Sequence, residues 1–200
     1  MPSGGSSPPS SRHAPQPAHP RQIRRHVISY QDVCRANLQV TRELEKLGFW
    51  SDRLNDVDVY WVSASWRCYG WCQGHIYIPA ISGANLSNFI LGTHVRLTDV
   101  LRHEWSHALA DRWPSLIATR RFAQTFCGDY ESVDPVSTYD PDRHLTHYST
   151  VMPCEDFAEV FHFYLRHKGR LPVRLANKPE IVKKWRFMDW MAERITKGTR

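Results

Sequence analysis

Apolar side chains recur at helical spacing in several segments of the chain. Between Ser29 and Gly48 they occur every three or four residues, which predicts an amphipathic helix that ends at the glycine. The stretch 97–111 has the same spacing, and we expect Thr98 to cap its start and Pro114 to stop it. Further helices are expected over 115–126, closed by Gly128, over 153–165, opened by Pro153 and ended by Gly169, and from Pro179 onward.

Two shorter segments show the alternation of apolar and polar residues that is typical of β-strands. They cover residues 56–66 and 74–78, and the stretch 69–71 between them is the expected turn. Several helices combined with a small sheet predict an α+β domain.

The remaining segments lack either pattern. Residues 1–22 are mostly Pro, Ser, Gly, Ala and Arg, so they cannot bury enough apolar surface to fold. We therefore expect a disordered tail over 1–22 and a folded domain over 23–200. Residues 82–94 form a looser stretch, and the polar segment 129–150 reads as a long loop of the kind that is often functional.

Composition supports a folded core and leads to expectations about membrane spans and the compartment of the protein. Hydrophobic residues make up 42% of the chain and aromatic residues 12%. No run approaches the roughly 18 consecutive apolar residues that a membrane span needs. The N-terminal arginines are not followed by an apolar stretch, so we find no secretory signal. We therefore expect a cytoplasmic monomer, with export by a route without a cleaved signal left open.

The net charge of +6 is unevenly distributed along the chain. Residues 1–26 carry four arginines and no acid, and residues 166–200 carry 11 basic residues against three acids. The middle holds 11 basic and 17 acidic residues. These basic ends allow a second hypothesis, a nucleic-acid-associated protein or a protease recruited to DNA, although neither end contains a recognised reader motif. A cationic substrate or a solvated charged surface fits the acidic middle equally well.

The five cysteines do not indicate a disulfide framework, because their number is odd for a chain of this size. Cys68 and Cys72 could pair or hold a metal, but two reduced thiols near a turn are the expectation that we adopt. A second zinc site would need two further ligands.

The most informative motif lies within the predicted helix 97–111. His103 and His107 are four residues apart, so both imidazoles project from one helix face and can reach one metal ion. Glu104 between them can act on water at that metal, as in the His-Glu-x-x-His signature of zinc metalloproteases. Asp111 shares their face one turn further on and could orient a supporting group. The alternative is a buried helix with two satisfied core histidines.

A catalytic zinc ion usually takes three protein ligands and leaves one position for water. The third ligand must come from elsewhere in the chain. Glu155 and Glu159 lie four apart on the helix that Pro153 opens, so one could bind zinc while the other accepts a hydrogen bond from a ligand imidazole. The candidates for the third ligand are Glu155, Asp156, Glu159, His144 and His147.

The two helices together resemble a known family. The stretch 103–111 is similar to the motif helix of thermolysin-like proteases. The stretch 155–161 resembles the third-ligand helix in the catalytic lobe of anthrax lethal factor and in uncharacterised bacterial zinc-binding metallopeptidases. The chain thus resembles a gluzincin. The resemblance is specific over about a tenth of the chain and diffuse through 57–165.

The resemblance carries expectations about fold and site. It implies a zincin-like α+β fold, in which a small mixed sheet packs on the motif helix, followed by further helices. It implies one Zn²⁺ on His103, His107 and Glu155, supported by Glu159. It also implies a transition-state role for Tyr148, with Tyr139 and His147 as rivals, and an edge position for the strand 74–78, which could otherwise be interior.

The leading hypothesis is therefore a zinc-dependent peptidase that acts on a peptide or protein substrate through Glu104 as the base. An inactive zinc-binding scaffold is a third hypothesis. The presence of Glu104 argues against it, because a structural site does not need that base.

Overall fold

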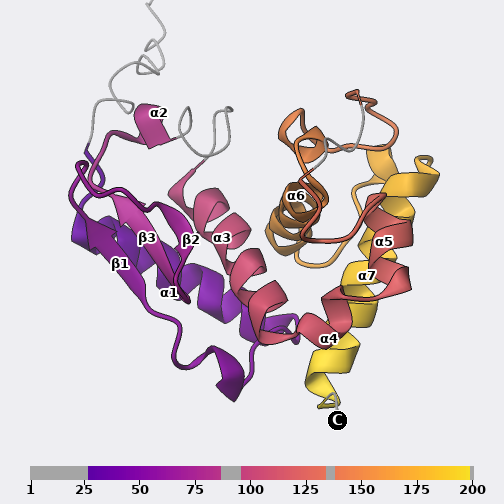
Figure 1. The fold of residues 1–200 in the computed structure, drawn as a ribbon, viewed down its shortest axis with the longest axis horizontal. Coiled ribbons are helices and arrows are strands. Elements are labelled where there is room, and N and C mark those ends of the chain that lie inside the picture. Colours follow the sequence, from indigo (N-terminus) through magenta and orange to yellow (C-terminus); the bar gives the residue numbers. More distant parts are fainter. Residues whose placement is uncertain (1–26, 87–95, 134–137, 199–200) are drawn as a thin grey trace, which may run out of the picture.

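A computed structural model of the protein describes residues 27–86, 96–133 and 138–198. The expected tail over 1–22 lies outside these ranges, as does most of the loose stretch 82–94. The α+β class is confirmed, with a three-stranded mixed sheet followed by helices (Figure 1). The helices are α1 (Tyr30–Lys46), α2 (Gly83–Leu86), α3 (Leu97–Arg112), α4 (Pro114–Ile117), α5 (Arg120–Phe126), α6 (Pro153–Arg166) and α7 (Pro179–Thr196), and the strands are β1 (Val59–Val62), β2 (Gly70–Cys72) and β3 (His75–Pro79).

The first predicted helix is confirmed as α1, and its start has a clear chemical cause. The Ser29 side chain accepts a hydrogen bond from the Asp32 amide, and the Asp32 carboxylate accepts one from the Ser29 amide. This reciprocal capping box satisfies two amides that have no partner within the helix.

The sheet has the strand order β1–β3–β2, with β1 parallel and β2 antiparallel to β3. β3 is therefore the central strand, and the expectation that 74–78 forms an edge is wrong. The predicted turn at 69–71 is also wrong, because Gly70 and Trp71 are part of the strand β2. The turn falls instead at Gln73 and Gly74, whose positive φ angles of 51° and 84° are typical of a tight two-residue hairpin.

Cys68 and Cys72 form a disulfide across the start of β2, which corrects the expectation of two reduced thiols. The Cα atoms of the two residues are 6.4 Å apart. Cys34, Cys127 and Cys154 are free.

Two helix boundaries differ from the prediction. The α3 helix begins at Leu97 after the cap residue Arg96, whose amide donates to Asp99, so Thr98 is not the cap. The expected helix over 115–126 is divided into α4 and α5. The division occurs because the Thr119 hydroxyl accepts a hydrogen bond from the Phe122 amide and caps a new helix.

The core lies where α3 packs beside α1, α6 and the sheet. In Figure 1 the sheet, α1 and α3 form one side of the molecule, and α5, α6 and α7 form the other. The apolar stripe predicted for the motif helix is buried, including Val100, Leu101, Trp105 and Leu109. Among the residues that the structure describes, no helix is both long and apolar enough to cross a membrane.

We expect the substitution Phe157→Ala to destabilise the protein by about 3–5 kcal/mol, because it leaves a cavity at the centre of an aromatic cluster. Phe157 is fully buried on α6, and its ring contacts those of Phe122, Phe126, Tyr130, Phe161 and Phe187. Urea unfolding followed by circular dichroism measures the loss.

The control for this prediction is Val173→Ala at a residue that is 92% exposed, where we expect a change within about 0.5 kcal/mol. Equal losses in the two variants would contradict a core role for Phe157.

Candidate metal centre

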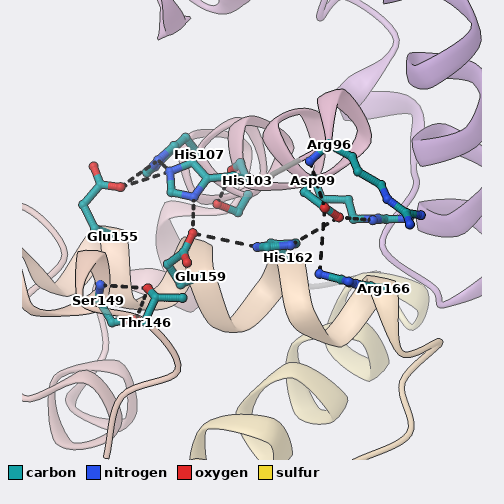
Figure 2. Close-up of polar contacts among 12 residues, drawn as sticks. Arg96, Asp99, His103, His107, Thr146, Ser149, Glu155, Glu159, His162 and Arg166 are labelled. Carbon is teal, nitrogen blue, oxygen red and sulfur yellow. Dashed lines mark hydrogen bonds and ion pairs between the residues drawn. The ribbon is translucent and has the colours of Figure 1, made fainter. Parts of the chain in front are cut away.

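Three side chains converge between α3 and α6. His103 and His107 project from α3, and Glu155 projects from the first turn of α6 (Figure 2). The Glu155 Oε2 atom lies 3.0 Å from His103 Nε2 and 3.8 Å from His107 Nε2. The two Nε2 atoms are 3.2 Å apart. Each residue thus offers one ligand atom to a common point.

These distances suit a tetrahedral metal ion. Ligands at zinc-like bond lengths of about 2.1 Å lie about 3.4 Å from one another in a tetrahedral arrangement. Glu155 Oε2 is buried and receives no hydrogen bond of normal geometry from the described residues. An acceptor left in this state is costly, and a cation would satisfy it. The donor set of two imidazoles and one carboxylate therefore fits a divalent metal with an open fourth position.

The other candidates for the third ligand lie elsewhere. Asp156 points away from the histidines and forms a buried ion pair with Lys184 at 2.6 Å. His144 Nδ1 accepts from the Asp140 amide, and His147 stacks on Tyr139. The structure thus brings Glu155, of the five candidates, to the position between the two Nε2 atoms.

Glu159 lies one turn beyond Glu155 and contacts His103 from the opposite side. Its Oε1 atom is 3.1 Å from His103 Nδ1, and both side chains are 2% exposed. A carboxylate in this position accepts the Nδ1 proton, so that Nε2 of His103 is left free to bind a metal.

Tyr130 occupies the corresponding position at His107. Its hydroxyl is 2.7 Å from His107 Nδ1. Asp111, which shares the helix face of the histidines, is exposed and pairs with the neighbouring Arg112 at 3.0 Å. The side chain that orients His107 is therefore a tyrosine from the loop after α5.

Glu104 is held by the backbone of β2. The Trp71 amide donates to its Oε2 atom at 2.7 Å. The preceding Gly70 has a φ of +73°, and a Cβ atom there would lie 2.7 Å from the same oxygen. A glycine at position 70 thus lets the strand approach the carboxylate closely enough for this hydrogen bond to form.

Burial and mutual charge set the titration of the centre. Burial lowers the pKa of His103, but its contacts with Glu155 and Glu159 outweigh this effect and raise it to about 10. Burial and the charge on His103 lower the pKa of His107 to about 4. Burial raises the pKa of Glu104, although the Trp71 amide and His103 oppose the shift. The two carboxylates that flank His103 thus favour positive charge at this point of the site.

The three converging residues line a cavity of about 1020 Å³, together with Glu104 and Gly70–Trp71. Tyr148 also lines it, and the rings of Tyr148 and His103 are 5.8 Å apart between centroids. Burial raises the pKa of the Tyr148 hydroxyl, as does the charge on Glu155, so this group stays protonated. Its rivals Tyr139 and His147 are not among the residues that line the cavity.

Sequence reasoning missed two contributors to this site, Tyr130 and the Trp71 amide. Tyr130 lies in a polar loop, and the path of a loop cannot be predicted from hydrophobic periodicity. The Trp71 donor is a backbone amide, which nearly every residue has, so the sequence does not single it out. Gly70 itself is the one signal present in the sequence, because an isolated glycine beside a predicted strand often marks a close backbone approach.

We expect Gly70→Ala to destabilise the protein more than Gly74→Ala. Both glycines have positive φ, so each alanine costs about 1–3 kcal/mol in backbone strain. At position 70 the new methyl group also collides with Glu104, whereas at position 74 the nearest side-chain atom is 3.9 Å away. Chemical denaturation measures both losses.

The difference between the two variants should disappear when Glu104 is changed to Ala, because the colliding carboxylate is then removed. A difference that persists in the Glu104→Ala background would show that the contact is not its cause.

Comparison of the chain with models of protein families, with curated proteins and with solved structures finds no match. The chemistry of this site therefore has to be argued from its own geometry.

Proposed function

We propose that this protein is a zinc-dependent metallopeptidase. The observation that carries the proposal is the convergence of His103, His107 and Glu155 in a cavity that also contains Glu104. Structural zinc sites are closed by four protein ligands, whereas catalytic sites have three and an open position. Within the described residues three ligands converge, and they face the cavity. This arrangement supports catalysis over a purely structural role.

The donor set supports zinc as the metal. Two neutral imidazoles and one carboxylate at tetrahedral spacing are typical of zinc in hydrolases. Zinc bound there would polarise a substrate carbonyl and lower the pKa of water. Glu159 and Tyr130 would keep the two imidazoles in the required tautomer and orientation.

The remaining chemistry falls to Glu104 and Tyr148. We assign Glu104 as the base that takes a proton from the attacking water and delivers it to the leaving amine. Its buried carboxylate, held by the Trp71 amide, has a raised pKa and is thus a stronger base than a solvated one. We assign the protonated Tyr148 hydroxyl as a donor to the oxyanion that develops on the carbonyl.

The position of β2 favours a peptide as the substrate. This strand lies at the edge of the sheet, and Gly70 and Trp71 line the cavity. An extended peptide can lie along such an edge, where the strand has no neighbour in the described sheet. The edge position that was predicted for residues 74–78 thus belongs to β2 instead.

We expect the purified protein to contain one equivalent of zinc, and Glu155→Gln to weaken zinc affinity at least about 100-fold. Loss of a supporting group alone costs about 10- to 100-fold, and Glu155 supplies a direct bond. Elemental analysis and chelator competition measure the two quantities. The matched control is Glu131→Gln, an exposed acid that lines the same cavity. Undiminished zinc in Glu155→Gln would refute this ligand set.

We expect Glu104→Gln to retain zinc and to lower peptide cleavage about 10²- to 10⁴-fold, because the amide cannot accept the proton of water. The measurement is digestion of a peptide library, read by mass spectrometry, with and without a chelator and after zinc is restored. Cleavage that survives both the substitution and the chelator would rule out the peptidase proposal.

A further inference from the structure

A line of buried charged side chains leads from the metal centre into the interface of α3 and α6 (Figure 2). Glu159 Oε1, which contacts His103, is also 3.8 Å from His162 Nδ1. On its other side, His162 Nε2 is 3.3 Å from Asp99 Oδ1. The side chains of His162, Glu159 and Asp99 are only 2–3% exposed.

His162 faces a carboxylate with each of its ring nitrogens. A neutral imidazole has one donor and one acceptor, so one of the two carboxylates would then face a lone pair. Only the imidazolium can donate toward both. Burial lowers the pKa of His162, but the flanking carboxylates outweigh burial and raise it. The cation thus balances two anions that are removed from water.

The outer end of this line is anchored to the rest of the fold. Arg102 donates to Asp99 Oδ1 at 2.5 Å and holds Glu43 of α1 through two hydrogen bonds of 2.7 and 2.8 Å. The Arg96 amide donates to Asp99 at 3.2 Å, and Arg166 lies 3.8 Å from it. Asp99 is thereby fixed, and the imidazole of His162 is held between this anchored carboxylate and Glu159.

We infer that His162 is a positioning residue for the metal centre, which acts by fixing the Glu159 carboxylate against His103. The inference rests on the proposed zinc site. Among the described residues, Glu159 makes polar contacts with His103 and His162. Without His162, one side of the carboxylate would lose its partner, and the carboxylate could turn away from His103 Nδ1. The His103 ring would then lose its fixed orientation toward the metal.

The competing explanation is that His162 only holds α3 and α6 together. A buried ion network can serve this purpose without any influence on a metal. The two explanations differ in their coupling to Glu159. A residue that acts through Glu159 has no further effect on the metal once Glu159 is removed, whereas an independent structural contribution persists.

The test is a double-mutant cycle of Glu159→Gln and His162→Gln, with zinc affinity measured by competition with a chromophoric chelator. We expect each single variant to lose about 10- to 100-fold in affinity, the range for groups that support a ligand. We expect the double variant to match Glu159→Gln within about 2-fold. The visible spectrum of the cobalt-substituted His162→Gln protein should shift in the same direction as that of Glu159→Gln.

The matched control is His167→Gln. His167 lies just after α6, and its ring contacts those of Phe163 and Trp185. The control variant should keep wild-type affinity and the wild-type cobalt spectrum. If His162→Gln does not fold, Asp99→Asn replaces it. This variant keeps the imidazole, loosens its outer anchor, and should shift affinity and spectrum in the same direction.

Three results would overturn the inference. One is unchanged zinc affinity in folded His162→Gln or Asp99→Asn. Another is a double variant whose loss equals the product of the two single losses. The third is an unchanged cobalt spectrum. Failure of the wild-type protein to bind zinc would instead remove the proposed metal centre itself, and the inference with it.

Discussion

The candidate metal centre depends on the packing of α3 against α6, two helices that are far apart in the sequence. α3 contributes two imidazoles, and α6 contributes the carboxylate that completes the set. A shift of one helix along the other by a single turn, about 5.4 Å, would move Glu155 out of reach. Phe157 and Phe161 of α6 are fully buried in the same hydrophobic core as Leu101 and Trp105 of α3. The packing that forms the hydrophobic core therefore also positions the three side chains of the site.

The same interface carries an unusual amount of buried charge. Asp99, Arg102, Glu159 and His162 are all less than a tenth exposed. Removing a charged group from water costs free energy. Partners at hydrogen-bond distance offset that cost, but the resulting network is generally no more stabilising than apolar side chains packed in the same space. Buried charge kept at such a cost is typical of functional sites, where orientation matters more than stability. Glu159 belongs to both the metal centre and this charged interface.

Much of this arrangement was accessible from the sequence. The spacing of His103 and His107 dictates that they share a helix face, and the Pro153 start fixes where Glu155 lies on its own helix. These are local consequences of helix geometry. The resemblance to gluzincins then indicated which of the candidate acids would meet the histidines, and the structure places Glu155 there.

Other parts depend on contacts that local patterns do not encode. β2 is only three residues long, too short to display alternation, so its residues were mistaken for a turn. His162 resembles any other histidine on an amphipathic helix until Asp99 is brought beside it. Tyr130 reaches His107 from a loop, and a loop's path is set by tertiary packing.

The bond between Cys68 and Cys72 makes the strand β2 sensitive to the redox conditions around the protein. Disulfides persist in the oxidising surroundings of the periplasm, the secretory pathway or the cell exterior. In the cytosol, thiol reductants keep cysteines reduced. The ring that this bond closes contains Trp71, whose amide holds Glu104. An oxidising compartment would therefore preserve a tether around the strand that carries the donor to the proposed base, and a reducing one would release it.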